Sequence, residues 1–373
     1  MYVLPTLGEL AHRTRLAFRA HLKGSDASLW PNNIYVAAKV LAGKAFEIFG
    51  FAAYIAKQMF AHTAPDIESL RMHGEEFGIP QKPAHPATGK VVITSSGALT
   101  VNANAVLERG DGVQYLVVDG GGLPGAGTLE VSVVAVRDGV AGNAVGGTAL
   151  TIVSGVTGDA LAEVAGGGLA LGAEIEDIES YRARILFRKR NPPHGGAPAD
   201  YVMWAGEVAG VSFDVERPTV FVERRWAGPG TVRVFPLMFD LYPDGIPHGA
   251  DVARVAAHIA ALAPAGAVVT VSAPVAVPVN ITIAGLSPDN TDVREAVLAE
   301  LRETFKRLSR VAGNDSEVAG MAYLAHPTSF SRSWIWQAVA NATGEQRHEI
   351  TSPVADIALA AGEMATLGTV TFA

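Results

Sequence analysis

The longest apolar pattern in the chain follows Trp30 and Pro31 and continues to Met59. Along it, apolar residues recur at alternating intervals of four and three, and large side chains alternate with small ones. This is the spacing of a coiled-coil seam. The members of the predicted seam are Ile34, Ala38, Leu41, Ala45, Ile48, Ala52, Ile55 and Met59. The pattern therefore predicts one long helix that packs against a partner helix.

A second apolar stripe lies next to this seam and widens it. It keeps the same spacing one position further on, and its members are Ala42, Phe46, Phe49, Ala53, Ala56 and Phe60. The combined arc is wider than one partner helix can cover, so the helix requires at least two neighbours. Gly43 and Gly50 each cost roughly 1 kcal/mol of helix propensity, which is compensated where another backbone approaches closely.

Two interpretations of this helix stay open at the level of sequence. It is either a buried core helix of the same chain or part of a helical bundle between chains. We favour the bundle because the helix precedes the globular regions and few helices nearby in the sequence are available to cover it. Phe46, Phe49 and the predicted seam are then the candidate partner-binding residues.

The pattern changes from Lys90 to about Val164, where short runs rich in Val, Ile and Thr are separated by glycine turns. The runs are KVVITSSG, DGVQYLVVDG, TLEVSVVAVRDG and TALTIVSG. They predict an antiparallel β domain. The segment Gly120–Gly125 formally matches GxGxxG, but it contains Pro124 and leads into a strand, whereas a dinucleotide loop opens a helix. We therefore expect a hairpin connection there.

The following helix is polarised in charge. Acidic residues open it and basic residues close it, which places each charge where it stabilises the helix dipole. The acidic residues are Glu174, Glu176, Asp177 and Glu179, and the basic ones are Arg188, Lys189 and Arg190. The spacing spreads the carboxylates around the helix, which argues against a catalytic or metal site. The basic end is a candidate polar interface, with a solvated helix end as the alternative.

After Gly230, strands and helices are mixed, and the sequence as a whole predicts an α+β fold. The strand Val275–Ile283 alternates regularly and contains Pro278, which places it near a sheet edge. A long helix is expected over Thr291–Val311. Four segments follow from these changes of pattern. They are an N-terminal helical assembly region (1–87), a Gly-rich antiparallel β domain (88–170), a helical connecting region (171–227) and a C-terminal α+β domain (228–373).

Composition excludes several classes of protein. The 373 residues are 49% hydrophobic and carry a net charge of -8, which argues against a nucleic-acid-coating protein because such binding depends on neutralising phosphates. The absence of cysteine excludes disulfides, thiolate zinc sites, iron-sulfur clusters and cysteine nucleophiles. No stretch reaches the roughly 18 uncharged apolar residues of a membrane helix, and the N-terminus does not resemble a signal peptide. We expect no nucleic-acid partner and no membrane insertion.

The common catalytic motifs are also missing from the sequence. The ten histidines form no HxxxH or HExxH pair, there is no GxSxG, and no Gly-Lys is followed by Ser or Thr as in a phosphate-binding loop. The sequence therefore predicts no catalytic residue, no cofactor and no metal, and indicates a protein that is not an enzyme.

An ordered series of segments resembles the baseplate J-like family. The segments are TAPDIESLRMHGEEFGIPQKPAHPATGKV, GNAVGGTALTIVSGVTG, GGGLALGAEIEDIESYRARIL, GGAPADYVMWAGEVAGV, GPGTVRV, PAGAVVTVSAP and LAAGEMATLGTVTF. Each alone is a glycine turn, a strand or an amphipathic helix, and the specificity lies in their order along nearly the whole chain. The members of this family are baseplate wedge proteins of contractile-tailed bacteriophages and of related injection machines.

The resemblance implies a structural wedge subunit that joins wedges into a ring around the central tail hub. Its partners would be other wedge proteins, copies of itself and hub proteins. It would be assembled in the host bacterial cytoplasm and end in the virion. A component of a phage-derived contractile injection particle is the nearest alternative. From other classes, a β-rich enzyme acting on a polysaccharide and an adhesin module remain alternatives.

Overall fold

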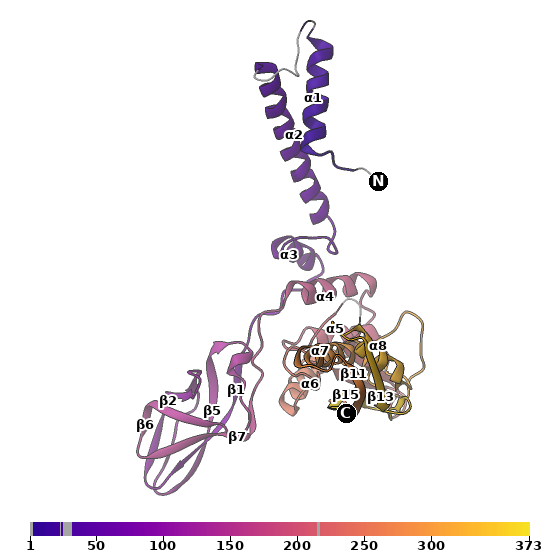
Figure 1. The fold of residues 1–373 in the computed structure, drawn as a ribbon. Coiled ribbons are helices and arrows are strands. Elements are labelled where there is room, and N and C mark those ends of the chain that lie inside the picture. Colours follow the sequence, from indigo (N-terminus) through magenta and orange to yellow (C-terminus); the bar gives the residue numbers. More distant parts are fainter. Residues whose placement is uncertain (1–2, 23, 25–31, 215–216) are drawn as a thin grey trace. The chain divides into compact units, whose positions relative to one another are not determined.

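The computed structural model describes residues 3–22, 24, 32–214 and 217–373. The chain forms two compact units, Met1–Gly78 and Ile79–Ala373. Figure 1 shows the helices of the first unit in indigo and violet. The two units are described in turn.

Three helices make up the first unit: α1 (Leu7–His21), α2 (Asn33–Gln58) and α3 (Ile67–Glu76). α1 begins with a capping box, in which Thr6 Oγ1 accepts from the Glu9 N–H and Glu9 Oε2 accepts from the Thr6 N–H. Asn32 caps α2. α2 is the helix that the spacing of four and three predicts, while Trp30 and Pro31, which precede it, lie outside the described residues.

The second unit begins with a closed antiparallel barrel. Its strands are β1 (Pro86–Ser95), β2 (Leu99–Arg109), β3 (Gln114–Val117), β4 (Gly121–Leu123), β5 (Gly127–Asp138), β6 (Ala149–Thr157) and β7 (Ala160–Ala170). The sheet order is β3-β5-β1-β7-β6-β2-β4, and the additional pairing of β3 with β2 closes it (Figure 1). Closure leaves few free strand edges.

Alternation along the barrel strands produces the barrel core. On β1, Val91 and Ile93 are fully buried, and Val131 and Val133 follow the same alternation on β5. The segment Gly120–Gly125 lies in the connection between β3 and β5, which pair antiparallel as the predicted hairpin requires, and its short strand β4 pairs with β2. An added Cβ at Gly120 would lie 2.6 Å from the carbonyl oxygen of Val101, so close backbone approach explains that glycine.

The C-terminal part of this unit is α+β, as predicted. Its helices are α4 (Ile178–Arg190), α5 (Pro198–Gly206), α6 (Gly249–Leu262), α7 (Thr291–Leu308) and α8 (Arg332–Asn341). Its strands are β8 (Val220–Arg224), β9 (Thr231–Pro236), β10 (Val268–Val271), β11 (Val275–Ser287), β12 (Ser329–Phe330), β13 (Arg347–Ser352), β14 (Ile357–Ala358) and β15 (Glu363–Phe372). They form sheets of order β10-β9-β8, β13-β11-β15 and β12-β14.

Two features of this region were predicted from the sequence, namely the division at residue 228 and the position of the strand that contains Pro278. The expected division between residues 227 and 228 falls in the turn that joins β8 to β9, and these strands pair along their whole length. The strand that contains Pro278 was expected near a sheet edge, but β11 is the middle strand of its sheet. Its pairing with β13 starts only at Thr282, so at Pro278 the strand has a neighbour on one side, β15. A proline is tolerated there because no second strand requires its missing N–H.

Among the described helices, none has the length and apolar character needed to cross a lipid bilayer.

Candidate assembly surfaces

α1 covers one side of α2. The two helices run in opposite directions next to each other (Figure 1), and Ala38 and Ala42 of α2 are completely buried in their contact. Alanine at these positions allows a close approach of the helix backbones. At the same contact, the Arg15 guanidinium lies 5.5 Å from the centre of the Tyr35 ring.

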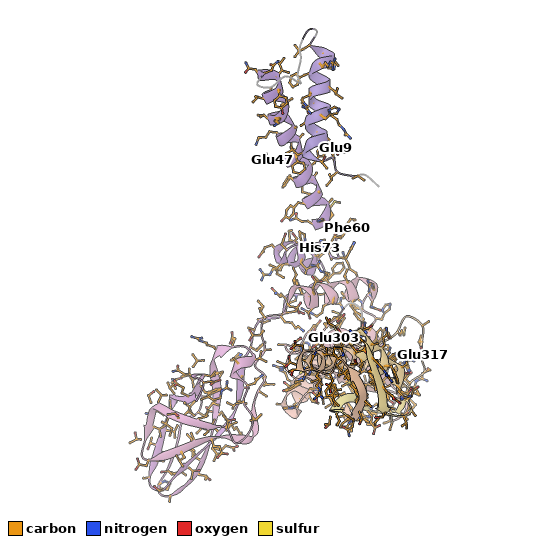
Figure 2. All side chains as sticks on the ribbon, in the orientation of Figure 1. Glu9, Glu47, Phe60, His73, Glu303 and Glu317 are labelled. Atoms are coloured by element: carbon orange, nitrogen blue, oxygen red, sulfur yellow. The ribbon has the colours of Figure 1, made fainter. Side chains whose placement is uncertain are left out.

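Most of the predicted seam lies outside this contact. Ile34 and Ala45 are half-buried. Ala52 is exposed, and so are the four remaining large side chains. The exposed fractions of the large members are Leu41 52%, Ile48 67%, Ile55 43% and Met59 65%. From the second stripe, Phe49 is half-buried whereas Phe46 is exposed. Figure 2 shows side chains projecting along α2, with Glu47 labelled on the helix and Phe60 just after its end.

Further apolar side chains, which the two predicted stripes do not include, are exposed on the same helix. They are Val36, Val40, Phe51 and Tyr54. The signal that could have found them is the composition of α2 itself, in which few polar residues interrupt the apolar ones on any side.

One continuous stripe of exposed side chains follows α2 at intervals of three and four. We call it the α2 outer face, and its members are Leu41, Lys44, Ile48, Phe51, Ile55 and Met59. Burying one such Leu, Ile or Phe side chain against a partner stabilises a complex by about 1.5–3 kcal/mol. The α2 outer face can therefore bind a further helix, with Lys44 as its single charged member.

Gly43 and Gly50 are not contacted by another backbone within this chain. A Cβ added at either position would have no described atom within 4 Å. The close approach that these glycines suggest is thus not made inside the described part of the chain.

α3 packs against the C-terminal end of α2. The backbone oxygen of Gln58 lies 2.8 Å from His73 Nε2, and the Tyr54 hydroxyl donates to Asp66, the N-cap residue of α3. The hydrogen bond from the Ser69 N–H, together with those from the Ser69 and Tyr54 hydroxyls, lowers the pKa of Asp66 to about 2. These contacts hold the start of α3 against α2.

A buried ionic cluster lies at the beginning of the second unit, and the sequence analysis did not identify it. Glu176 accepts two hydrogen bonds from Arg184, each 2.7 Å long, and both side chains are 1% exposed. Lys82 Nζ lies 3.6 Å from Glu176 Oε1 and donates to the backbone oxygens of Gly206 and Val211. Such a cluster is stable only when each charge has its partners.

Residues of α4, together with Glu176 just before it, form hydrogen bonds with the backbone of the segment Ile79–Lys82. Tyr181 donates to the Ile79 oxygen, Arg184 donates to the Pro80 oxygen, and the Lys82 N–H donates to Glu176. These are the first residues after the helical unit. We call the segment Ile79–Lys82, together with Glu176, Tyr181 and Arg184, the junction anchor.

From its position in the sequence, Glu176 is expected at the acidic start of a helix, together with its neighbours. Asp177 does have that role, because it caps α4 and accepts from the N–H groups of Glu179 and Ser180. Glu176 instead points into the protein toward Lys82, its buried partner 94 residues earlier. No local sequence signal marks a contact over that distance.

The basic end of α4 is partly solvent-accessible. Arg188 is half-buried, while Lys189 and Arg190 are exposed. Arg190 lines a cavity of about 350 Å³ together with Phe187, Arg217 and Tyr323. This end can thus present positive charge next to a partly aromatic hollow.

The described His, Asp and Glu side chains contain no group of three or more that could hold a metal ion. The Arg224–Asp315 and Arg294–Asp289 ion pairs are bidentate contacts between neighbouring segments. Hydrogen bonds from Arg294 lower the pKa of Asp289. Burial raises the pKa of Asp315, but hydrogen bonds from the Arg224 side chain and from backbone N–H groups outweigh it, so that pKa is lowered as well. Such contacts stabilise structure.

Two models of one protein family match the chain. Residues 193–273 match the model of the baseplate J-like central domain, and residues 279–373 match that of the baseplate J-like protein C-terminal domain. Baseplate protein gp47 of Escherichia phage Mu is 33% identical over 314 residues, which cover 82% of this chain and 85% of that protein. Putative protein JayE of Escherichia coli (strain K12) is 35% identical over 74% of this chain and 96% of that protein. A cryo-EM structure of the anti-feeding prophage baseplate aligns with 99% of this chain and 100% of its own, with a TM-score of 0.40 and 10% identity.

Proposed function

Because the chain belongs to the baseplate J-like family, we propose that it is a structural wedge subunit of a contractile phage tail. The sequence identity with the Mu baseplate protein, over most of both chains, indicates a component of a phage-type tail baseplate. In the proposal, it joins neighbouring wedges into a ring around the central hub. It is made in the host cytoplasm and becomes part of the virion.

The observation that carries the proposal is the exposed α2 outer face. Leu41, Ile48 and Phe51 are each more than half exposed, whereas α1 covers only the side that contains Ala38 and Ala42. A contiguous apolar surface on a soluble chain is the mark of a protein interface. The exposed members of the predicted seam, Leu41, Ala52, Ile48, Ile55 and Met59, together with Phe46 and the half-buried Phe49, would serve as the binding surface for helices of other wedge proteins, whereas Ala38 is occupied by α1.

A ring of identical subunits needs two different patches on each chain, because its contacts are heterologous. The helical unit supplies a patch for other wedge proteins. The region from about Gly228 to the C-terminus supplies the contact between neighbouring copies, and Arg188, Lys189 and Arg190 form a polar rim beside it. Hub proteins lie inside the ring.

Imaging of the intact particle tests this assignment. In a cryo-EM reconstruction, each wedge should contain this chain, with the α2 outer face packed against helices of a different protein and residues after Gly228 against another copy. A reconstruction in which the chain occupies the tail tube or a receptor-binding fibre would contradict it.

A further inference from the structure

Strand β15 lies at the edge of the sheet β13-β11-β15, and its outer edge is covered only at the start. The Ala312 N–H donates to the Glu363 oxygen, and the Gly362 N–H donates to the Ala312 oxygen. Ser309 Oγ then donates to the Ala365 oxygen at 2.7 Å. The segment that leaves α7 therefore covers this edge as far as Ala365.

Beyond Ala365, β11 is the only strand that pairs with β15 in the described part of the chain. Backbone groups of a strand in a parallel pair point to alternate sides. The N–H and C=O of Leu367 therefore point to the same outer edge as those of Ala365. This part of the edge is open to another strand.

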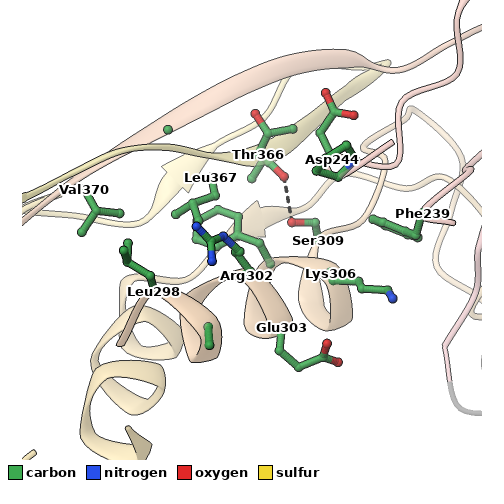
Figure 3. Close-up of a pocket in the computed structure, with 15 residues that line it drawn as sticks. Phe239, Asp244, Leu298, Arg302, Glu303, Lys306, Ser309, Thr366, Leu367 and Val370 are labelled. Carbon is green, nitrogen blue, oxygen red and sulfur yellow. Dashed lines mark hydrogen bonds between the residues drawn. The ribbon is translucent and has the colours of Figure 1, made fainter. Parts of the chain in front are cut away.

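A cavity of about 690 Å³ lies along this open edge, between residues 365–370 of β15 and helix α7. Figure 3 shows Leu298 of α7 opposite Leu367 and Val370 of the strand. Phe239 and Asp244 line one end of it. Residues 366–370, beyond the covered start, span roughly 16 Å at about 3.3 Å per residue, and the strand has an irregularity between Leu367 and Val370.

Four charged residues line this space, namely Asp244, Arg302, Glu303 and Lys306. Arg302 points from α7 toward the strand, whereas Glu303, its neighbour in sequence, points away from it (Figure 3). In the described residues no carboxylate lies within ion-pair distance of Arg302. The cavity thus combines an open backbone edge, apolar walls and the Arg302 guanidinium pointing toward the strand, while Asp244 and Lys306 also line it.

We propose that this groove binds an extended, acidic-apolar segment of a neighbouring baseplate protein. The segment adds as a strand to the outer edge of β15 and continues the cover that Ser309–Ala312 begins. An apolar side chain enters the cavity beside Leu298 and Leu367, and an acidic side chain pairs with Arg302. Main-chain hydrogen bonds supply affinity, and the alternate side chains supply specificity. The inference rests on the proposed function, because the neighbour is a baseplate protein.

Thiol labelling in assembled particles tests whether the groove is occupied. The chain contains no cysteine, so Ala299→Cys places one thiol at the exposed wall of the cavity. We expect maleimide to modify the free full-length chain fast and the assembled chain at least about tenfold more slowly. Glu295→Cys, exposed on the same helix but outside the cavity, is the matched control and should react equally in both states. Equal reactivity of Ala299→Cys in both states would overturn the proposal.

Charge reversal tests the chemistry of the occupant. Arg302→Glu should restore fast labelling of Ala299→Cys in particles that still contain the chain, or reduce incorporation of the chain at least about tenfold. Arg307→Glu, on the exposed surface of α7 outside the cavity, should change neither. The thermal unfolding of both variants should match that of the parent chain. Protection that persists in Arg302→Glu would show that the occupant is not an acidic segment.

The two proposals fail in different ways. Absence of the chain from baseplates would contradict the proposed function. Normal presence in baseplates with an unprotected Ala299→Cys thiol would contradict only the strand-binding groove.

Discussion

Lys82 Nζ lies 3.6 Å from Glu176 Oε1, and both side chains are buried. This contact connects the first residues after the helical unit to the residues just before α4. Arg184, in the middle of α4, supplies the second cation that pairs with Glu176. The first unit ends at Gly78, so Ile79–Lys82 is the covalent connection from the helical unit to the rest of the chain. The junction anchor is therefore the place where stability and assembly are expected to depend on the same side chains.

Glu176→Gln should strongly destabilise the second unit. Removing the carboxylate charge leaves Lys82 and Arg184 buried without a counter-charge, which costs about 3–5 kcal/mol. Glu179→Gln is the matched control, because Glu179 is 68% exposed in its pair with Arg182 and should cost less than about 1 kcal/mol. Urea unfolding followed by tryptophan fluorescence measures both. Similar losses in the two variants would contradict the role of Glu176.

The stability contributed by Lys82 should rise with pH. Burial lowers the pKa of Lys82 from 10.5 to about 8, partly opposed by Glu176. Between about pH 8 and 10, the unfolded chain holds a proton on Lys82 that the folded chain has released, so the free energy of unfolding increases with pH.

The measured quantity is the difference in unfolding free energy between wild type and Lys82→Met. It should increase by roughly 2 kcal/mol from about pH 8 to 10. The same difference for Lys90→Met, whose side chain is 60% exposed in its ion pair, should stay constant. A Lys82 difference that falls with pH would show that the ammonium is not destabilised by burial.

Replacing Leu41 and Ile48 together by Asp should abolish binding to other wedge proteins. Both side chains are exposed in the isolated chain, so the barrel and the C-terminal part should remain folded. Co-sedimentation with the remaining baseplate proteins measures binding, and thermal unfolding measures folding. Lys57→Asp, an exposed change on the same helix away from the α2 outer face, should leave binding intact. If the double variant unfolds the whole chain, α2 is a core helix.

The purified chain should be monomeric or dimeric at micromolar concentration. A subunit that closed rings on its own would do so before the wedges were complete, so the contact between copies must be weak in the free protein. Analytical ultracentrifugation tests this. In assembled rings, cross-links between neighbouring copies should connect residues after Gly228, and cross-links confined to residues 1–80 would contradict the assignment of the patches.

The chain should hydrolyse neither bacterial cell-wall nor surface glycans. The bidentate carboxylates described above are held in ion pairs, and the relatives with printed functions are baseplate proteins. Release of reducing sugars from isolated glycans is the assay. Reproducible turnover that a single carboxylate substitution removes, with unchanged stability, would show that the protein is an enzyme.

The sequence by itself determined the elements and much of their order. The recurrence of apolar residues at intervals of four and three predicts α2, and the run from acidic to basic residues predicts α4. Pro198 is the first residue of α5, a position that suits proline. The glycine-punctuated runs define the strands of the barrel. These features are local, because backbone periodicity and capping depend on residues only a few positions apart. The four-part division of the chain and the roles of the predicted seam and of Arg188–Arg190 remain predictions.

Only the tertiary structure decided which surfaces meet. Periodicity shows that one side of a helix or strand is apolar, but not which element covers it. The barrel closes through the pairing of β3 with β2 and with β5, β11 lies in the middle of its sheet, and α1 covers Ala38 and Ala42 while leaving Leu41 and Ile48 exposed. Glu176 looks like any other carboxylate at a helix start. Its burial follows from a contact with Lys82 across 94 residues, and such a contact depends on the packing of the whole unit.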